Sequence, residues 1–587
     1  MFDQIRMVCT PSRLMVILLL TCHIGLLSYG AARISPTSLE TSAMVAGVYH
    51  WKTGKVDLYE VNPPLLRLIA TIPVVLAQAH FLVEPSDIED SLRPEYSLGR
   101  SFISWNSQHF QSLFVWSRWA CIPFSVLGGI VVYLWGRELS GTAGGLVSLT
   151  LWCFSPSILA YGQLMACDLG ASVLGLLASY SLSKWLDIPS WHRTFVAGGL
   201  LGLALLGKLT WIVLLPLWPI LWLIIRWIAG KQNFRAELPK MVTIIIVAVI
   251  TLNVGYGFKG TGTPLGKIKF VSHFFGGKET ALTAIPSVDQ NTFSNSFIAG
   301  VPIPFPISFV IGLDKQKFDF EQRNFSYLRG EWRSPGWWWY YLYALLVKET
   351  SGLWLMFIVA TIFALFAGGP PTTKLLLVIS PALAVLVIVS SQIGMNAHYR
   401  YVIPILPFVF IFASTWVRLL FVDKLSKKYP QNLDRGSQSI FRLAGIFILC
   451  AAILNHICSS LYLSPHTLAY FNEVAGGPRH GHEHLLGTNI SVGQDLAALE
   501  EWCSNHPKAG PFIAAIDSPV PKRHWKVPLV DNENLLASAH QQNVRPIWYA
   551  ISVNQLWSRD RRFVFLRHQT PFARVGDATL VFRPPQS

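Results

Sequence analysis

Two isolated carboxylates in this chain could do chemistry at a membrane surface. Glu40 lies in the polar segment that follows the first apolar run, and Asp168 interrupts a later apolar stretch. A charged side chain beside membrane segments is costly, and it is a candidate functional residue by default. A carboxylate in a partly desolvated cavity can take a proton from an acceptor hydroxyl during group transfer. We therefore predict an enzyme in which Glu40 and Asp168 are the catalytic acids.

Each acid also has a structural interpretation. Glu40 precedes a stretch with helical spacing, and a carboxylate at a helix start stabilises that terminus through the helix dipole. Asp168 could likewise be an acid that is solvated at the start of a helix. If both carboxylates serve one reacting centre, they must lie on the same side of the membrane and within reach of one substrate.

Cations at membrane level supply the second half of the predicted site. Lys208, Lys348 and Arg400 interrupt or flank apolar stretches, and we predict that they hold a phosphate or pyrophosphate leaving group. The alternative is ordinary interfacial anchoring, in which the long side chain reaches the headgroup layer. Further polar side chains nearby are predicted to contact the substrate: Asn62, Tyr161, Glu331, Asn396, His398 and Tyr401.

Other cofactor chemistry has little support in the sequence. Three histidines at period two, His480, His482 and His484, would share one face of an extended segment and could ligate a metal. No phosphate-binding loop, dinucleotide fingerprint or nucleophilic-serine motif stands in a convincing context. No cofactor is therefore assigned, and a divalent metal stays an open alternative.

The composition is that of a polytopic membrane protein. Of 587 residues, 52% are hydrophobic and 13% are charged, against about 25% charged in soluble domains. The net charge of +15 comes mostly from short loops between apolar runs, where Lys and Arg orient helices, so nucleic acid is not the expected partner. Most of the eight cysteines lie in or beside apolar runs, which argues against a disulfide framework.

About eleven apolar runs are long enough to span a bilayer. They are 12–33, 118–137, 142–163, 168–186, 194–207, 209–229, 241–258, 351–368, 374–392, 400–421 and 440–461. The first run lacks a convincing cleavage site and should remain as an anchor. With the N-terminus inside, the two most basic loops, 226–240 and 423–442, both face the cytoplasm, as positively charged loops prefer.

This topology predicts the domain organisation. A transmembrane module of residues 1–461 would carry two large external segments, 34–117 and 259–350. The apolar run 65–83 contains Arg67 and Pro73, so we predict an interfacial or re-entrant helix there. Short alternating apolar stretches after the last span predict a small external α/β domain over 462–587.

The order of several motifs resembles the GT-C superfamily of polyprenyl-phosphate-sugar glycosyltransferases, in its protein O-mannosyltransferase and lipid A aminoarabinose transferase branch. The motifs are Leu39-Glu40 with Gly47, Pro63-Pro64-Leu65, Asp168 after a Ser-Pro stretch, and a Gly-Leu-rich helix ending at Lys208. The resemblance covers roughly residues 12–460. Two segments of the tail, 468–478 and 492–496, are similar to the ends of bacterial members.

The resemblance implies a GT-C fold and a membrane enzyme that transfers a sugar, with inversion, from a polyprenyl-phosphate donor to an acceptor outside the cytoplasm. It implies a bacterial inner membrane, with the N-terminus cytoplasmic, the C-terminal domain extracytoplasmic, and the bilayer, the lipid-linked donor and an acceptor of unknown type as partners. The family has an Asp before its Glu, and this chain has Leu39 there. A polytopic transporter or flippase and an inactive lipid-binding scaffold are the competing functions.

Overall fold

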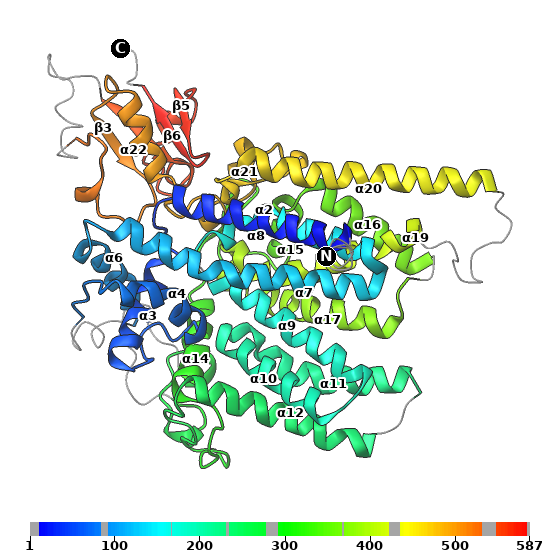
Figure 1. Cartoon of the computed structure of the whole chain (residues 1–587). Helices are drawn as coiled ribbons and strands as arrows, with labels where there is room; N and C mark the ends of the chain where they lie inside the picture. Colours follow the sequence, from blue (N-terminus) through cyan, green and yellow to red (C-terminus); the bar gives the residue numbers. More distant parts are fainter. Residues whose placement is uncertain are drawn as a thin grey trace, which may run out of the picture.

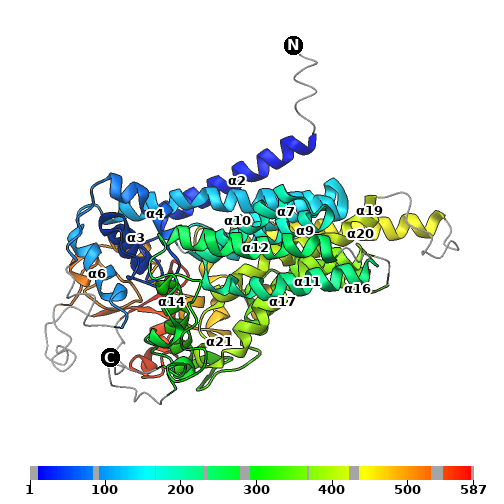
Figure 2. The ribbon, with the colours of Figure 1, turned by 90° about the horizontal axis from the view of Figure 1, so that it is seen from below.

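A computed structural model describes residues 11–83, 92–165, 167–230, 234–277, 291–366, 369–421, 435–530 and 547–583. The chain forms a bundle of long helices with a small α/β unit at one end (Figure 1). Figure 2 shows the same helices running side by side, with α2 along α7. The predicted class, a mainly helical membrane bundle with a small C-terminal α/β part, is confirmed. Most of the basic loop 423–442 lies outside the described residues.

Seven helices of the described residues are long and apolar enough to cross a membrane, and nine if two bent helix pairs each count as one span. The seven are α2 (Pro11–Arg33), α7 (Phe110–Cys153), η1 with α11 (Leu209–Ile228), α12 (Phe234–Gly255), α17 (Thr372–Ser391), η4 to α19 (Tyr399–Phe421) and α20 (Arg435–Leu463). The bent pairs are α8 (Pro156–Gly162) with α9 (Cys167–Asp187), and α15 (Tyr340–Lys348) with α16 (Ser351–Phe366).

Two features account for the difference from the eleven predicted runs. The 44 residues of α7 are two helices joined by a kink at Gly141, and the second packs back along the first, because the Trp152 indole donates to the Ser125 carbonyl at 3.0 Å. The predicted run 118–137 and the first half of 142–163 are therefore counted as one element. The kink depends on the glycine, because its φ of 76° lies in a region that side chains rarely adopt. Helix α10, Trp191–Gly207, has 17 residues and is shorter than the roughly 20 that a span needs.

The predicted external segments all gather at one end of the bundle (Figure 1). The first contains α3 (Thr41–Thr53), α4 (Pro64–Leu76) and α6 (Glu95–Trp105), which pack on one another and on α7. Helix α4 has 13 residues and is too short to span, in agreement with the predicted interfacial helix. The second contains α14 (Ile307–Glu321) and a hairpin of β1 (Ser326–Leu328) and β2 (Glu331–Arg333).

The C-terminal unit contains a four-stranded sheet in the order β3-β4-β6-β5. Strand β3 (Phe512–Ala515) pairs in parallel with β4 (Trp548–Ser552), and β6 (Thr579–Phe582) runs antiparallel to both β4 and β5 (Ala573–Val575). Helix α22 (Leu496–Asn505) belongs to the same unit. The domain boundary at residue 461 stays a prediction.

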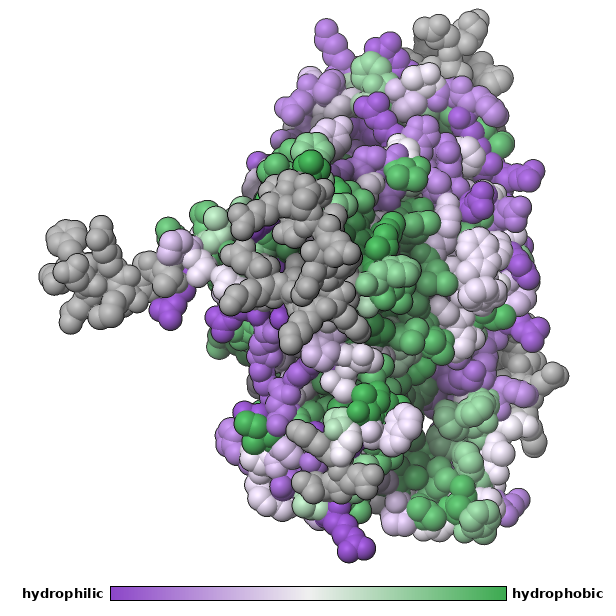
Figure 3. Space-filling model, turned by 90° about the vertical axis from the view of Figure 1, so that its right-hand side faces the viewer, coloured by the Kyte–Doolittle hydropathy of each residue, from purple (hydrophilic) through white to green (hydrophobic). Residues whose placement is uncertain are grey.

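One apolar core joins the bundle to the C-terminal unit. Buried side chains of the bundle, such as Trp152 and Trp211, belong to the same cluster as Ile490 and Ile551. The unit is therefore docked on the helices rather than tethered to them. Figure 3 looks onto the opposite end of the bundle, where apolar side chains occupy a broad central zone beside polar ones.

Candidate active site

The predicted acid Asp168 lies where a helical path breaks. It stands in the first turn of α9, after a bend of 115° between α8 and α9, and it is 4% exposed. Lys208 lies where α10 ends and η1 begins, and Arg400 lies in the 3₁₀ segment η4 (Tyr399–Ile405). Irregular backbone at membrane depth is tolerated only where protein or a cavity surrounds it. All three charged residues thus stand at such breaks.

The two cations converge on this carboxylate. Lys208 Nζ donates to Asp168 Oδ1 at 2.5 Å, and Arg400 Nη1 lies 3.6 Å from Asp168 Oδ2. Arg400 Nε is buried and has no hydrogen-bond partner among the described residues. One carboxylate oxygen, Asp168 Oδ2, and one guanidinium N–H, that of Arg400 Nε, therefore remain available to a substrate.

Aromatic and imidazole rings surround the two cations. The ring of Tyr401 lies 5.6 Å from Lys208 Nζ and 5.5 Å from the Arg400 guanidinium carbon, in cation–π geometry. His398 packs edge-on against Tyr401, and its Nδ1 lies 2.8 Å from Thr488 Oγ1. The structure thus places His398 and Tyr401 beside the cluster of Asp168, Lys208 and Arg400, and their contact with a substrate stays a prediction.

Glu40 is buried in a different setting from the one predicted. The carboxylate is 0% exposed, and its two oxygens accept five hydrogen bonds: two from Arg118, two from Thr37 and one from the Met165 N–H. Two carboxylate oxygens have about four lone-pair sites, so these donors use the whole accepting capacity. Glu40 does not face an open cavity, and its role as a proton acceptor stays a prediction.

A short path nevertheless joins the two predicted acids. Met165 N donates to Glu40 Oε1 at 2.8 Å, and Met165 stands three residues before Asp168. Three residues span at most about 11 Å between Cα atoms. Glu40 and Asp168 therefore lie at the same end of the bundle, and Glu40 fixes the segment that leads into α9.

Lys348 is bound elsewhere. It is 4% exposed, and its Nζ donates to the carbonyls of Leu468 and Asn489 at 2.8 Å each, with the ring of Phe471 4.5 Å away. These partners belong to the segment after the last span. In this arrangement Lys348 fastens that segment to α15 and does not point at Asp168, so its predicted phosphate contact has no geometric support.

The remaining predicted residues divide into two groups. Tyr161 is buried, close enough to Asp168 and Arg400 to interact with their charges. Asn396 is also buried, two residues before His398. Asn62 uses its carbonyl to accept from an arginine of α4, at 3.2 Å. Glu331 is exposed on the β1–β2 hairpin, which contacts the segment of His482 and His484. The structure thus brings Tyr161 toward Asp168 and leaves Glu331 on the surface.

Two tyrosines near Arg400 were missed by the sequence analysis. Tyr59 and Tyr96, from the first external segment, lie within electrostatic range of Arg400. Burial raises the pKa of both phenols above the ordinary range, so both keep their protons and can donate hydrogen bonds at neutral pH. Tyr59 lies in a turn and Tyr96 in the first turn of α6, and neither belongs to a motif that would distinguish it in the sequence.

A buried asparagine was also missed. Asn489 Oδ1 accepts the N–H of Tyr399 at 2.8 Å, and its Nδ2 donates to Tyr340 Oη at 3.0 Å and to the carbonyls of Leu486 and Ala397. Tyr399 directly precedes Arg400. The C-terminal segment thereby holds the backbone that carries one of the site cations.

The histidine run does not form a metal centre. Residues Gly481–His484 are a helical turn, α21, rather than an extended segment. His482 stacks on Trp557, His484 lies against Phe471, and His480 pairs with Glu483. Among the described residues, no group of three or more His, Cys, Asp or Glu side chains could hold a metal ion.

Known proteins resemble this chain in part. No curated protein matches it. Among solved structures, ArnT from Cupriavidus metallidurans bound to undecaprenyl phosphate is similar at 12% identity, with 97% of each chain covered and a TM-score of 0.44. The same protein in its apo state is similar at 13% identity, with 98% of each chain covered and a TM-score of 0.43.

The family model described as dolichyl-phosphate-mannose-protein mannosyltransferase matches residues 102–256. This region contains Asp168 and Lys208, together with Arg118, the partner of Glu40. It does not include Glu40 or Arg400. The resemblance that the motifs predict is confirmed here: residues 102–256 match the dolichyl-phosphate-mannose-protein mannosyltransferase family of GT-C glycosyltransferases.

Proposed function

We propose that this protein is a membrane glycosyltransferase that moves a sugar from a polyprenyl-phosphate donor to an acceptor outside the cytoplasm, with inversion at the anomeric carbon. One observation carries the proposal: Asp168 lies between Lys208 and Arg400 in a buried cluster. Two of these three residues fall within the part of the chain that matches the mannosyltransferase family.

The charges of the cluster suit a phosphate group. One carboxylate and two cations leave one excess positive charge in a buried environment. Arg400 can offer its unpartnered Nε–H to a phosphate oxygen, in the geometry that guanidinium groups favour. Cations that are already in place also stabilise the charge that develops on the leaving polyprenyl phosphate.

Asp168 is the proposed general base. Its Oδ1 accepts from Lys208, whereas its Oδ2 has, among the described residues, only Arg400 at 3.6 Å and can accept a proton. The acceptor oxygen would attack the anomeric carbon on the face opposite the phosphate, and its proton would pass to Asp168 Oδ2. The bond from the anomeric carbon to the phosphate oxygen breaks, and polyprenyl phosphate leaves with the electron pair. One displacement of this kind inverts the anomeric centre.

Glu40 has a positioning role in this scheme. Its five hydrogen bonds tie the first external segment to Arg118 of α7 and to Met165, three residues before Asp168. Leu39, which stands where the family has an Asp, is buried in the apolar core. An apolar residue at that position fits a protein in which the base lies at Asp168.

The proposal includes the placement in the membrane. The external segments and the C-terminal unit lie together at one end of the bundle (Figure 1), which supports an active site that opens on one side of the membrane. We assign that side to the exterior of a bacterial inner membrane, with the N-terminus in the cytoplasm. The transmembrane module then comprises residues 1–461 and the extracytoplasmic domain residues 462–587, which would help to position the acceptor.

An assay with the purified protein in lipid vesicles tests the function. Undecaprenyl-phosphate sugars labelled in the sugar are supplied one at a time, together with a bacterial envelope extract as the source of acceptors. The proposal predicts that one donor yields labelled product and free undecaprenyl phosphate, with the opposite anomeric configuration in the product. Movement of intact donor across the bilayer without its consumption would instead identify a flippase, and binding without either event would identify a scaffold.

A further inference from the structure

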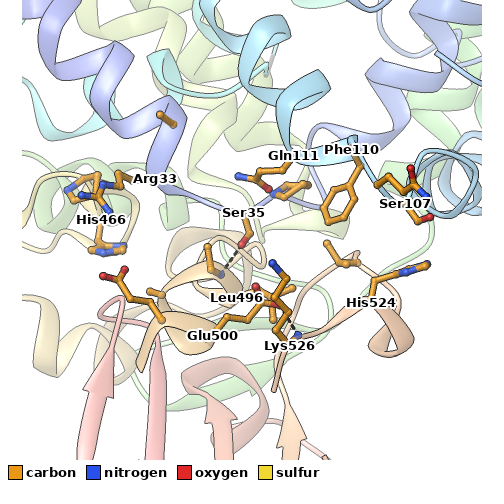
Figure 4. A pocket seen from close by; sticks show the side chains of 18 of the residues that line it. Arg33, Ser35, Ser107, Phe110, Gln111, His466, Leu496, Glu500, His524 and Lys526 are labelled. Carbon is orange, nitrogen blue, oxygen red and sulfur yellow. Dashed lines mark hydrogen bonds between the residues drawn. The ribbon is translucent and has the colours of Figure 1, made fainter. Parts of the chain in front are cut away.

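A cavity lies apart from the cluster of Asp168, Lys208 and Arg400. Its volume is about 920 Å³, and it is bounded by the end of α2, the start of α7 and the first turns of α22 (Figure 4). Neither Asp168 nor Lys208 nor Arg400 lines it. Sites for small ligands have volumes of roughly 300–1,000 Å³, so this cavity can hold a headgroup and the glycerol attached to it.

The mouth of this cavity lies at the level of the lipid headgroups. Arg33 ends the spanning helix α2 and lines the cavity together with Tyr29, which is 49% exposed. On the neighbouring helix α7, Trp116 and Trp119 are 41% and 45% exposed. The Trp119 indole donates to a carbonyl of α2 at 3.3 Å, so these rings lie beside the end of that helix. Exposed Trp and Tyr on membrane helices mark the bilayer interface.

The lining carries charges of both signs. Arg33 and Lys526 are exposed, and no carboxylate forms an ion pair with either within the described part of the chain. His466 lies beside Arg33 on one side of the cavity, and His524 lies on the opposite side (Figure 4). Glu500 and Glu501 also line the cavity, from α22, where one Glu500 oxygen accepts the backbone N–H of Lys526. The cavity can therefore bind an anion and a cation at the same time.

We propose that this cavity binds the headgroup of an amine-bearing phospholipid. The phosphate binds Arg33 and Lys526, and the primary ammonium group binds Glu500 and Glu501. The acyl chains extend from the mouth along the apolar outer surface of α2, where Leu18 and Ile24 are exposed. A headgroup without an ammonium group satisfies only half of these charges, and a quaternary amine cannot donate hydrogen bonds to the carboxylates.

The position of the cavity gives the lipid a structural effect. Ser35, in its wall, accepts the N–H of Ala497 at 2.6 Å, and its own N–H donates to the carbonyl of Gln494 at 3.1 Å. The Ser35 carbonyl accepts from Arg118 at 2.8 Å. A lipid bound here therefore bridges the end of α2 and the C-terminal unit, next to the pair of Arg118 and Glu40. We expect bound lipid to raise the melting temperature of the whole chain.

Native mass spectrometry of the full-length protein in detergent tests the proposal. The probes are phosphatidylethanolamine, phosphatidylglycerol and phosphatidylcholine with identical acyl chains, and glycerophosphoethanolamine as the headgroup without chains. We expect one phosphatidylethanolamine per protein, bound roughly tenfold more tightly than the other two lipids, the factor given by about 1.4 kcal/mol from one charge-assisted contact. Equal binding of all three lipids, or binding of the free headgroup as tight as that of the lipid, would overturn the proposal.

Two double variants separate the roles of the charges. Arg33→Gln with Lys526→Gln should lose affinity for both phosphatidylethanolamine and phosphatidylglycerol. Glu500→Gln with Glu501→Gln should keep phosphatidylglycerol and lose the preference for the amine. Because that preference is a ratio measured on one sample, it does not depend on the amount of folded protein. Lys508→Gln, an exposed lysine of the same unit outside the cavity, is the control. An unchanged ratio in the glutamate variant would contradict the ammonium site. The experiment uses no glycosyl donor, so its outcome is independent of the transfer assay that tests the proposed function.

Discussion

Lys208 Nζ lies 2.5 Å from Asp168 Oδ1, and the two side chains are 8% and 6% exposed. A buried pair of this kind pays a desolvation cost that is recovered only while both partners are present. The pair also joins the end of α10 to the start of α9, two helices that pack along each other. The contact between Lys208 and Asp168 therefore contributes both to the stability of the site and to its arrangement of charges.

Replacement of Lys208 by methionine should leave the Asp168 carboxylate buried with only the longer contact to Arg400. We expect a loss of about 3–5 kcal/mol in the free energy of unfolding, the usual effect of breaking a buried ion pair. Denaturant unfolding in detergent measures it. Lys374→Met is the matched control, because Lys374 pairs with Asp187 at the other end of α9 in an exposed position worth at most about 1 kcal/mol. Equal losses in the two variants would show that the buried pair is not important for stability.

Glu40 and Arg118 should behave as one unit. Glu40→Gln and Arg118→Met each break the same buried pair, so the double variant should be little worse than either single variant in transfer rate and in stability. A double-mutant cycle measures both quantities. If Glu40 were the proton acceptor, Arg118→Met would retain far more activity than Glu40→Gln, and that outcome would return the role of base to Glu40.

Replacement of Arg400 by lysine should weaken donor binding more than it slows turnover. A lysine keeps the positive charge but cannot offer the second N–H that a guanidinium presents to a phosphate. We expect KM for the lipid-linked donor to rise roughly tenfold, equivalent to about 1.4 kcal/mol, with a smaller change in kcat. Arg333→Lys, on the exposed strand β2, is the comparison and should leave both constants unchanged. A fall in kcat at constant KM would place Arg400 at the reacting centre instead.

Asn489 should affect both the stability of the fold and the binding of the donor, although it does not contact the substrate. Asn489→Ala removes the acceptor of the Tyr399 N–H, and a buried unpaired donor costs roughly 1–3 kcal/mol. Because Tyr399 precedes Arg400, the same change should raise KM for the donor. Thermal unfolding and steady-state kinetics test the two effects, with Asn505→Ala, an exposed residue of α22, as control. Loss of stability with an unchanged KM would limit Asn489 to a role in folding.

Asp495 predicts a dependence of stability on pH. Burial raises the pKa of this carboxyl well above its ordinary range, while it accepts from the Ala578 N–H and the Thr579 hydroxyl. The folded state then holds a proton that the unfolded state releases at lower pH. Stability should therefore fall as pH rises from the ordinary Asp pKa toward the folded one.

Asp495→Asn should flatten this decline, which thermal unfolding between pH 4 and 8 can measure as a change in slope. Asp560→Asn is the control. Asp560 is exposed and its pKa is lowered by the Ser558 hydroxyl, so its contribution changes only below the ordinary Asp pKa. If Asp495→Asn kept the slope of the wild type, the buried carboxyl would not be the source of the pH dependence.

The sequence predicted the membrane bundle, the small C-terminal α/β unit and the three residues Asp168, Lys208 and Arg400. Charges in apolar stretches are costly, and each of these three interrupts or flanks one. What the sequence could not show is that the three residues meet. Their meeting depends on the bend before α9, the end of α10 and the 3₁₀ segment η4, which are set by tertiary packing.

Two residues show where local patterns mislead. Lys348 resembles Lys208 in the sequence, but its partners are backbone carbonyls of Leu468 and Asn489, more than a hundred positions along the chain. Glu40 was predicted to line a cavity. In the structure its carboxylate is fully hydrogen-bonded, and Arg118 supplies two of the five donors. Arg118 stands at the start of the predicted run 118–137, where a buried charge needs a partner, but the sequence does not show which carboxylate supplies it.

The transfer rate of Asp168→Asn tests the central claim most directly. The measured quantity is the release of undecaprenyl phosphate from the labelled donor by purified protein in vesicles, with Asp187→Asn, at the other end of α9, as the matched control. We predict wild-type release by the control and a loss of about a hundredfold or more in Asp168→Asn, the lower limit for general base catalysis. Release by folded Asp168→Asn at the wild-type rate would contradict the account.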